Sequence, residues 1–408
     1  MSPPSTFPPE IFDNIIDELA TSKNALSACS LVHSSWAPRS KTHMFRNIAY
    51  KVDSPERDQR PSGDRTAAFQ QHVASNRTVA SYARHLVLTL TNRENIAAEI
   101  PQASQLHDLL SLILKCSNLI IYSVNDAVLT RLLGFIRQNN RLKRISLQSV
   151  IVDPSAFDVF MTCVAIRTRE LQALHLHDVW APDWITDAWS RWRTGHAGCN
   201  PKYKSHSLTK LCISHCEDGV IPAILRAFDV QGLQRLALLS LDWDSCAAMV
   251  SATLHATLLD LTMDFSNHRP MSSNVSREDH IFYRLASIPN LQLVLKHFRD
   301  APSVLHRLYC ASSQRQPLLQ KLHLHFRRYP SPTDTMVDKA LAELCSIIPL
   351  RISIGFDAEE GVRAACATTV CSREQIAALF PFMNRRGSLR FQSLDDWWDD
   401  SESRKSDF

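Results

Sequence analysis

The chain has 408 residues, of which 45% are hydrophobic, and it carries a formal net charge of +4. This length is too great for one ordinary core, so two or more units, or one elongated repeat array, are expected. Only 9 residues are glycine, and no GxGxxG, GxxxxGK[ST] or GxSxG motif occurs, which disfavours enzymes that depend on glycine-rich phosphate loops or nucleophile elbows. The mixed charge also disfavours a nucleic-acid-binding protein.

The 11 cysteines are odd in number and scattered along the chain. No secretory signal precedes them, so we expect buried free thiols in a reducing compartment. No apolar run approaches the ~20 residues that are needed to cross a bilayer. These features predict a cytoplasmic or nuclear protein without a membrane partner.

Three short helices are predicted between residues 7 and 48. The first begins at Pro8 and Pro9, where a missing N–H is harmless. Its apolar residues recur at the spacing of one helix face: Ile11, Phe12, Ile15, Ile16 and Leu19. A second helix follows a break at Thr21–Ser22, and a third begins at Pro38. We expect the second helix to turn Leu26, Cys29 and Val32 inward, and the third to carry Met44, Phe45 and Ile48.

Beyond a polar connection at residues 51–66, one alternating apolar pattern recurs, as in LKRISL, LQALHL and LQKLHL. Its central apolar residues are Ile145, Leu174, Leu211, Leu236, Leu261, Leu293, Leu322 and Ile352, with weaker members at Leu88 and Ile121. Helix-like stretches stand between these segments. Strand and helix alternating about every 30 residues are typical of a leucine-rich-repeat solenoid. A doubly wound sheet alternates in the same way, but recurring LxxLxL with so little glycine favours the solenoid.

Two HxH pairs, His175–His177 and His323–His325, each share one face of a strand because residues two apart point the same way. The leucines between them face the core, so the histidines are expected to face outward. A zinc site would need about two further ligands, and the sequence offers no obvious third one. Cys212-x-x-His215-Cys216 has nearly the spacing of a metal clip, but no second clip follows at a zinc-finger distance. We therefore expect no metal and no cofactor.

Outward strand positions also carry positive charge at Arg144, Lys210, Arg235 and Lys321. With the outward histidines they could contact an acidic segment of a substrate, although such residues equally suit an ordinary solvated face. The candidate substrate-binding residues are Arg144, His175, His177, Lys210, Arg235, His323 and His325.

Residues 7–48 resemble an F-box, and the similarity to fungal F-box proteins continues through PRSKTHMFRNI and AFQQHVASNRTVASYARHLVLTL. The residues that match the family pattern are FPPEI at Phe7–Ile11, then Ile15, Leu19, Leu26, Leu31, Val32 and Trp36. The resemblance implies a substrate receptor of a Skp–cullin–F-box (SCF) ubiquitin ligase, which docks on a Skp-type adaptor and holds a protein substrate for ubiquitin-dependent degradation. The adaptor-binding residues that it implies are Pro8, Pro9, Glu10, Ile11, Ile15, Leu19, Leu26, Leu31, Val32 and Trp36.

We therefore predict an α/β protein with an F-box-like three-helix domain at residues 5–50 and a linker at 51–81. An irregular leucine-rich-repeat-like solenoid is expected at 82–356, and a C-terminal helix with an acidic tail at 357–408. The chain is expected not to be an enzyme, since ubiquitin transfer would occur on other subunits of the cullin–RING ligase. The alternative is a repeat-based interaction scaffold without a ligase, in which the N-terminal helices cap the array.

Overall fold

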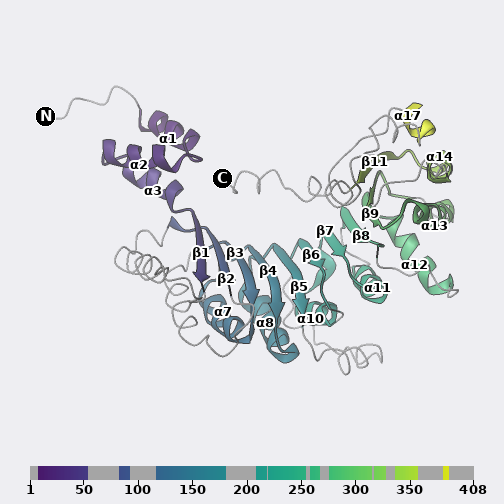
Figure 1. Ribbon diagram of the computed structural model, residues 1–408, viewed down its shortest axis with the longest axis horizontal. Coiled ribbons are helices and arrows are strands. Elements are labelled where there is room, and N and C mark those ends of the chain that lie inside the picture. Colours follow the sequence, from purple (N-terminus) through teal and green to yellow (C-terminus); the bar gives the residue numbers. More distant parts are fainter. Residues whose placement is uncertain are drawn as a thin grey trace, which may run out of the picture. The chain divides into compact units, whose positions relative to one another are not determined.

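The computed structural model describes residues 8–53, 82–91, 116–180, 208–217, 219–253, 258–266, 275–314, 317–327, 336–356 and 380–385. The chain divides into two compact units, and their described parts lie within residues 8–180 for unit 1 and 208–385 for unit 2. Most of the predicted linker and the acidic end of the predicted tail lie outside the described residues. Each unit is α/β, and its strands follow the order of the sequence (Figure 1).

Unit 1 begins with three helices, α1 (Pro9–Glu18), α2 (Lys23–Val32) and α3 (Ala37–Met44). Proline stands in the first turn of α1 and of α3, and the Ser22 hydroxyl accepts a 3.4 Å hydrogen bond from the Ala25 N–H at the start of α2. The three predicted helices are thus confirmed. Ile48, however, was expected on the third helix and instead lies in a strand.

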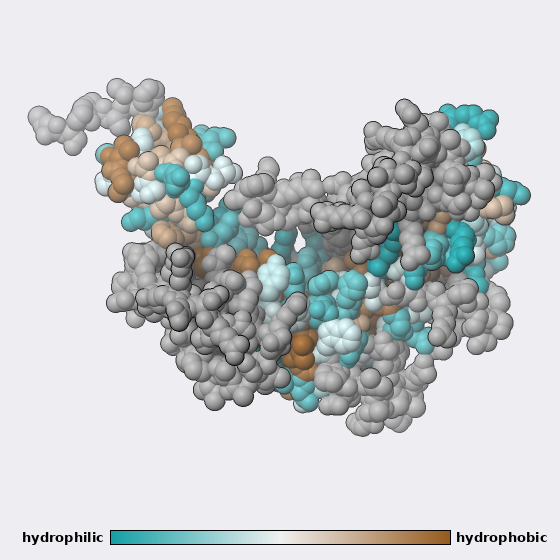
Figure 2. All heavy atoms as spheres, in the orientation of Figure 1, coloured by the Kyte–Doolittle hydropathy of each residue, from teal (hydrophilic) through white to brown (hydrophobic). Residues whose placement is uncertain are grey.

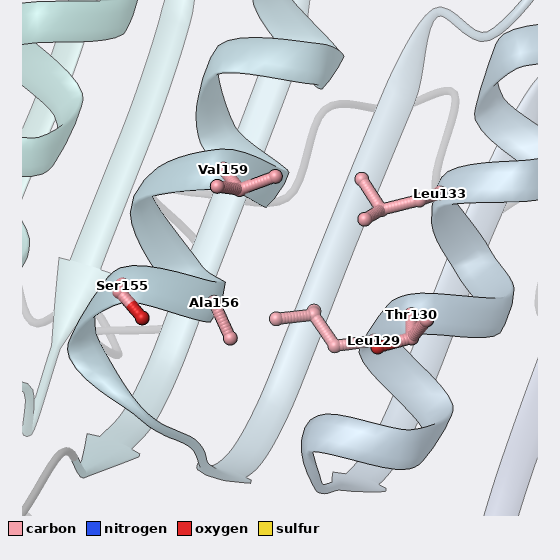
Figure 3. A pocket seen from close by; sticks show the side chains of 6 residues that line it. All are labelled: Leu129, Thr130, Leu133, Ser155, Ala156 and Val159. Carbon is pink, nitrogen blue, oxygen red and sulfur yellow. The ribbon is translucent and has the colours of Figure 1, made fainter.

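Five parallel strands follow in unit 1: β1 (Asn47–Asp53), β2 (His85–Thr91), β3 (Asn118–Val124), β4 (Arg144–Ile151) and β5 (Ala173–Trp180). Their register aligns one apolar ladder, Ile48, Leu86, Leu119, Ile145 and Leu174. Helices α7 (Asp126–Gln138) and α8 (Pro154–Arg167) lie side by side over one face of the strands (Figure 3). β1 also takes in residues 51–53, which were expected to belong to the polar connection.

Unit 2 repeats this strand–helix alternation. Its strands are β6 (Lys210–Ser214), β7 (Arg235–Leu239), β8 (Asp260–Asp264), β9 (Asn290–Leu295), β10 (Lys321–Phe326) and β11 (Arg351–Phe356). Its α-helices are α10 (Val220–Ala227), α11 (Trp243–Ala252), α12 (Val275–Leu285), α13 (Ala301–Gln314), α14 (Met336–Ile347) and α17 (Pro381–Arg385), with short 3₁₀ turns η3 (Val230–Gly232) and η4 (Phe298–Asp300). Each helix from α10 to α14 packs on the next (Figure 1). All ten strands that were predicted from their central apolar residues are confirmed.

A left-handed residue recurs where strands end. Ser123, Ser149 and Asp178 have φ angles of 59°, 51° and 57° in β3, β4 and β5, and His215 and Ser240 have 52° and 53° directly after β6 and β7. This conformation costs a non-glycine residue roughly 1–2 kcal/mol. At the ends of these five strands the left-handed conformation is therefore adopted without glycine, which agrees with the scarcity of glycine in the sequence.

The two units differ in how deeply they bury the strand face opposite the apolar ladder. In β3 and β4 of unit 1, alternate residues such as Ile120 and Ser146 are half-buried, as in a strand with one face open to solvent. In β8, β9 and β10 of unit 2, nearly every residue is buried on both faces. No helix among the described residues is long and apolar enough to cross a bilayer.

Candidate protein-binding surfaces

Helices α1 and α2 expose an unusual amount of apolar side chain. Ile11 and Ile15 on α1 are 42% and 52% exposed, and Leu31 and Val32 at the end of α2 are 85% and 65% exposed. Figure 2 shows hydrophobic atoms over both helices. Val32 was expected to face inward, and the structure corrects this because it lies at the exposed end of its helix. We refer to Ile11, Ile15, Leu31 and Val32 as the apolar face.

A small core lies beneath this face. Ile16 and Leu26 are 1% and 0% exposed, and the rings of Phe12 and Trp36 lie 5.0 Å apart between centroids. Leu26 was among the predicted adaptor-binding residues, and its complete burial shows that it supports the helices from within. Leu19 and Trp36 are half-buried. The three helices therefore form a small core of their own, and the apolar face remains exposed to solvent.

Pro8 and Glu10 are exposed at the start of α1, and Pro9 forms its first turn. The prolines begin the helix, and Glu10 lies at the positive end of its dipole. At the end of α2, the His33 Nδ1 accepts a 3.2 Å hydrogen bond from the Ser35 N–H and lies 2.7 Å from the Ser35 hydroxyl oxygen. His33 and Ser35 thus fix the turn between α2 and α3.

An ion cluster that the sequence analysis missed joins α1 to α3. The Arg39 guanidinium donates to both oxygens of Asp17, at 2.7 and 2.5 Å, and the His43 Nε2 lies 2.8 Å from Asp17 Oδ1. The hydrogen bond from Arg39, with a further contribution from His43, lowers the pKa of Asp17 to about 2. The four-residue spacing of Arg39 and His43 places both on one helix face, which is the signal that could have indicated a shared acidic partner.

The candidate substrate-binding residues fall into two groups. In unit 1, Arg144 and His175 are half-buried and His177 is exposed, on the adjacent strands β4 and β5. In unit 2, Lys210 and Arg235 are direct neighbours in the register of β6 and β7. Arg235 forms a 3.1 Å ion pair with Asp260 of β8, so part of the predicted positive charge there is neutralised.

The structure corrects the prediction for the second histidine pair. His323 and His325 were expected to face solvent, but they are 5% and 1% exposed. Burial, with the neighbouring His325, lowers the pKa of His323 to about 4. The imidazole of His323 is therefore neutral at pH 7. Strand alternation identified the correct face of β10, and the error was to assume that this face is open.

His323 belongs to a polar row that the strand register aligns across four strands, Thr262, Gln292, His323 and Ser353. The first three are buried and Ser353 is half-buried. The Thr262 hydroxyl donates to Gln292 Oε1 at 3.1 Å, and His323 Nδ1 lies 2.7 Å from the Ser353 hydroxyl oxygen. Among the described residues, the side-chain Nε2 atoms of Gln292 and His323 have no hydrogen-bond partner. Such groups are costly to bury, so the row is a polar layer with incompletely satisfied hydrogen bonds.

A second cluster that was missed lies at the ends of the unit 2 strands. Asp264, whose side chain is 0% exposed, accepts from the Arg327 Nη2 at 2.5 Å, from the Ser240 N–H at 3.1 Å and from the Ser266 N–H at 2.7 Å. Arg327 also donates to the Ser240 hydroxyl oxygen at 2.9 Å. Burying a carboxylate is costly unless charged partners and hydrogen-bond donors surround it, and Arg327, Ser240 and Ser266 supply these donors. Asp264 ties the ends of β7, β8 and β10 together.

The other candidate features are a cysteine motif and a small slot between two helices. Burial raises the pKa of the Cys212 thiol to about 12, so it is protonated and poorly suited to nucleophilic attack or metal binding. No group of three or more potential metal ligands occurs among the described residues. A slot of about 180 Å³ between α7 and α8 is lined mainly by apolar side chains, including Leu129, Leu133 and Val159 (Figure 3). It is smaller than the ~300–1,000 Å³ that is usual for ligand pockets.

Comparison with known proteins gives little beyond this geometry. No family model matches the chain. No curated protein matches it either. Among solved structures, the chain is similar to one described as the Rad7 and Elc1 complex in yeast, with 13% sequence identity and a TM-score of 0.34. The similarity covers 90% of this chain and 93% of that one.

Proposed function

We propose that this chain is the substrate-recognition subunit of an SCF-type ubiquitin ligase. In this proposal α1 to α3 form the F-box and dock on a Skp-type adaptor. The strand–helix units hold a protein substrate. The chain itself performs no chemistry, because ubiquitin transfer takes place on other subunits.

The observation that supports the proposal most strongly is the apolar face of α1 and α2. A monomeric protein rarely leaves Leu31 at 85% exposure beside Val32 at 65% without a reason. The core beneath them is already complete, with Ile16 and Leu26 buried, so the face is not needed for folding. Exposed apolar anchors spaced along helices suit a groove of a helical partner. The resemblance of residues 7–48 to an F-box supports a Skp-type adaptor as that partner.

The mechanism is proximity. A substrate held on the same chain as the ligase anchor presents its lysines at a high effective concentration to the charged ubiquitin carrier. Ubiquitin transfer is then faster because the substrate is held in a stable position, and this chain needs no catalytic side chain. The described residues fit this role, since rigid strand–helix units provide extended surfaces for protein partners.

The test is capture of the full-length chain on an immobilised, purified Skp-type adaptor. The wild type is compared with the double variant Ile15→Asp, Leu31→Asp, and with Leu259→Asp as a control in unit 2, where Leu259 is 48% exposed. Burial of one large apolar side chain contributes about 1.5–3 kcal/mol. The double variant should therefore lose at least about 100-fold in affinity, while the control binds as the wild type does.

Failure of the wild type to bind the adaptor would contradict the ligase assignment. Equal binding by the double variant would show that the adaptor contacts another surface. Circular dichroism of each variant checks that the helices are retained.

A further inference from the structure

Unit 1 has a strongly basic edge where its strands begin. Eight arginines and lysines occur in the described turns that lead into β1, β2, β4 and β5 and in the last turns of α7 and α8. They are Arg46, Arg84, Arg137, Arg141, Lys143, Arg144, Arg167 and Arg169. Within the same described turns the only carboxylate is Glu170. We call these eight residues the basic edge.

Backbone hydrogen bonds hold the turns of this edge against one another. The Arg84 N–H donates to the Arg46 carbonyl at 2.9 Å, and the Ser117 N–H donates to the Arg84 carbonyl at 2.9 Å. The Lys143 N–H then donates to the Ser117 carbonyl at 2.7 Å, and the Gln172 N–H donates to the Lys143 carbonyl at 2.8 Å. The side chains therefore project from one continuous ladder. With strands ~4.8 Å apart, five strands give an edge about 19 Å long.

Most of this charge is exposed and not neutralised. Arg46, Arg141, Lys143, Arg167 and Arg169 are exposed, and none of the five forms an ion pair with another described residue. Eight cations gathered on one edge with a single described carboxylate, Glu170, repel one another. Such an arrangement destabilises the free protein slightly and raises the local concentration of an anionic partner.

Helix dipoles explain part of the pattern. Arg137 and Arg167 lie in the last turns of α7 and α8, where a cation is stabilising. Arg46 and Arg169 lie two residues beyond the ends of α3 and α8, close to the same negative dipole ends. Lys143 lies five residues beyond the end of α7, so its charge is not explained by that dipole.

The opposite edge of the same strands is acidic, and there the acids have structural roles. Asp153 caps α8 by accepting from the Ser155 and Ala156 N–H groups, and Asp126 accepts from the Asp153 N–H at 2.9 Å. Asp178 accepts from the Ser149 hydroxyl at 3.2 Å and from the Trp180 indole N–H. Among the described residues of unit 1, the basic edge thus lies at the end of the strands opposite to Asp126, Asp153 and Asp178.

We propose that the basic edge binds an acidic, extended segment of a polypeptide. An edge of about 19 Å matches roughly six residues of extended chain at ~3.3 Å per residue. A single peptide chain is narrow enough to follow one edge. A nucleic-acid duplex is wider and more densely charged than a single peptide chain, and competition with DNA distinguishes the two partners. That the peptide belongs to a ubiquitination substrate rests on the proposed function, whereas the binding itself does not.

The test uses the full-length chain and fluorescein-labelled octapeptides in fluorescence anisotropy. One peptide alternates glutamate with serine, and its counterpart carries glutamine in place of glutamate. The double variant Arg141→Glu, Lys143→Glu is compared with Arg299→Glu, Lys339→Glu, a control with the same change of charge at exposed sites of unit 2. A single-stranded DNA of equal charge serves as competitor.

The proposal predicts that the glutamate peptide binds at least tenfold more tightly than the glutamine peptide at 50 mM salt. The Arg141, Lys143 variant should lose about tenfold for the glutamate peptide, and the control less than twofold. The proposal is overturned by equal binding of both peptides, by an equal loss in the control, or by DNA that binds more tightly than the glutamate peptide.

Capture on the adaptor separates this result from the proposed function. The Arg141, Lys143 variant should be retained by the adaptor as the wild type is, since neither residue belongs to the apolar face. Peptide binding by a chain that no adaptor retains would support the basic edge and contradict the ligase assignment.

Discussion

The burial of His323 leads to a specific dependence of stability on pH. Its pKa is about 4 in the folded chain, against the ordinary value of 6.5 for histidine. A histidine with a lowered pKa in the folded state binds its proton more readily when the chain is unfolded. Stability is therefore unaffected by this group above about pH 7 and is lost as the pH falls from about 6.5 toward 4.

The size of the loss follows from these two pKa values. At pH 5 the unfolded imidazole is almost fully protonated and the folded one is mostly neutral, which costs about 2 kcal/mol of unfolding free energy. Below pH 4 the loss approaches about 3 kcal/mol. The ring centroids of His323 and His325 lie 6.2 Å apart. The neighbouring imidazole of His325 also lowers the pKa of His323 and so adds to the effect of burial.

The assay is urea unfolding of wild type and His323→Gln at pH 7.5 and pH 5.0, followed by tryptophan fluorescence. Trp243 of unit 2 packs against Phe265, at 5.5 Å between ring centroids, and reports on this unit. The wild type should lose about 2 kcal/mol more than the variant between the two pH values. Equal losses in both proteins would refute the argument that His323 is buried in its neutral form.

Three further changes test other parts of the structure by chemical denaturation. Leu26→Ala should cost about 2–5 kcal/mol because it leaves a cavity, whereas Leu31→Ala should change stability by less than about 0.5 kcal/mol; equal effects would contradict the assigned burial. Asp264→Ala should cost about 3–5 kcal/mol by leaving Arg327 without its anion, and a loss below about 1 kcal/mol would show that the pair is not needed. Asp17→Asn should make the helices of residues 9–44 less stable at pH 7 but not near pH 2, where the wild-type carboxylate is itself being protonated; a pH-independent difference would count against its ion pairs.

The strand pattern was readable from the sequence because the core ladder uses the same residue types in the same alternation at every repeat. Leu211, Leu236 and Leu261 occupy equivalent register positions, and one LxxLxL segment predicts the next. β1 was missed because Met44, Phe45 and Ile48 also fit a helix. Only pairing of Ile48 with Leu86 in β2 decides in favour of a strand, and that contact is distant in sequence.

The candidate site residues were harder to predict, because the exposure of a side chain depends on which other parts of the chain cover its face of the sheet. Alternation places His177 and His323 in the same way, yet one is exposed and the other is buried. The cluster of Asp264 and Arg327 joins residues that are 63 positions apart, and no local pattern indicates such a pair. By contrast, Ile15 and Leu31 are exposed, and their role in docking stays a prediction.

Docking through the apolar face is tested most directly by a hydrogen-exchange footprint of the chain with and without the Skp-type adaptor. We expect the adaptor to slow amide exchange across residues 9–18 and 23–36, which carry the apolar face, and to cause no change across residues 118–180. Formation of a complex that protects unit 2 and leaves residues 9–36 unchanged would contradict the central claim. So would the absence of any complex.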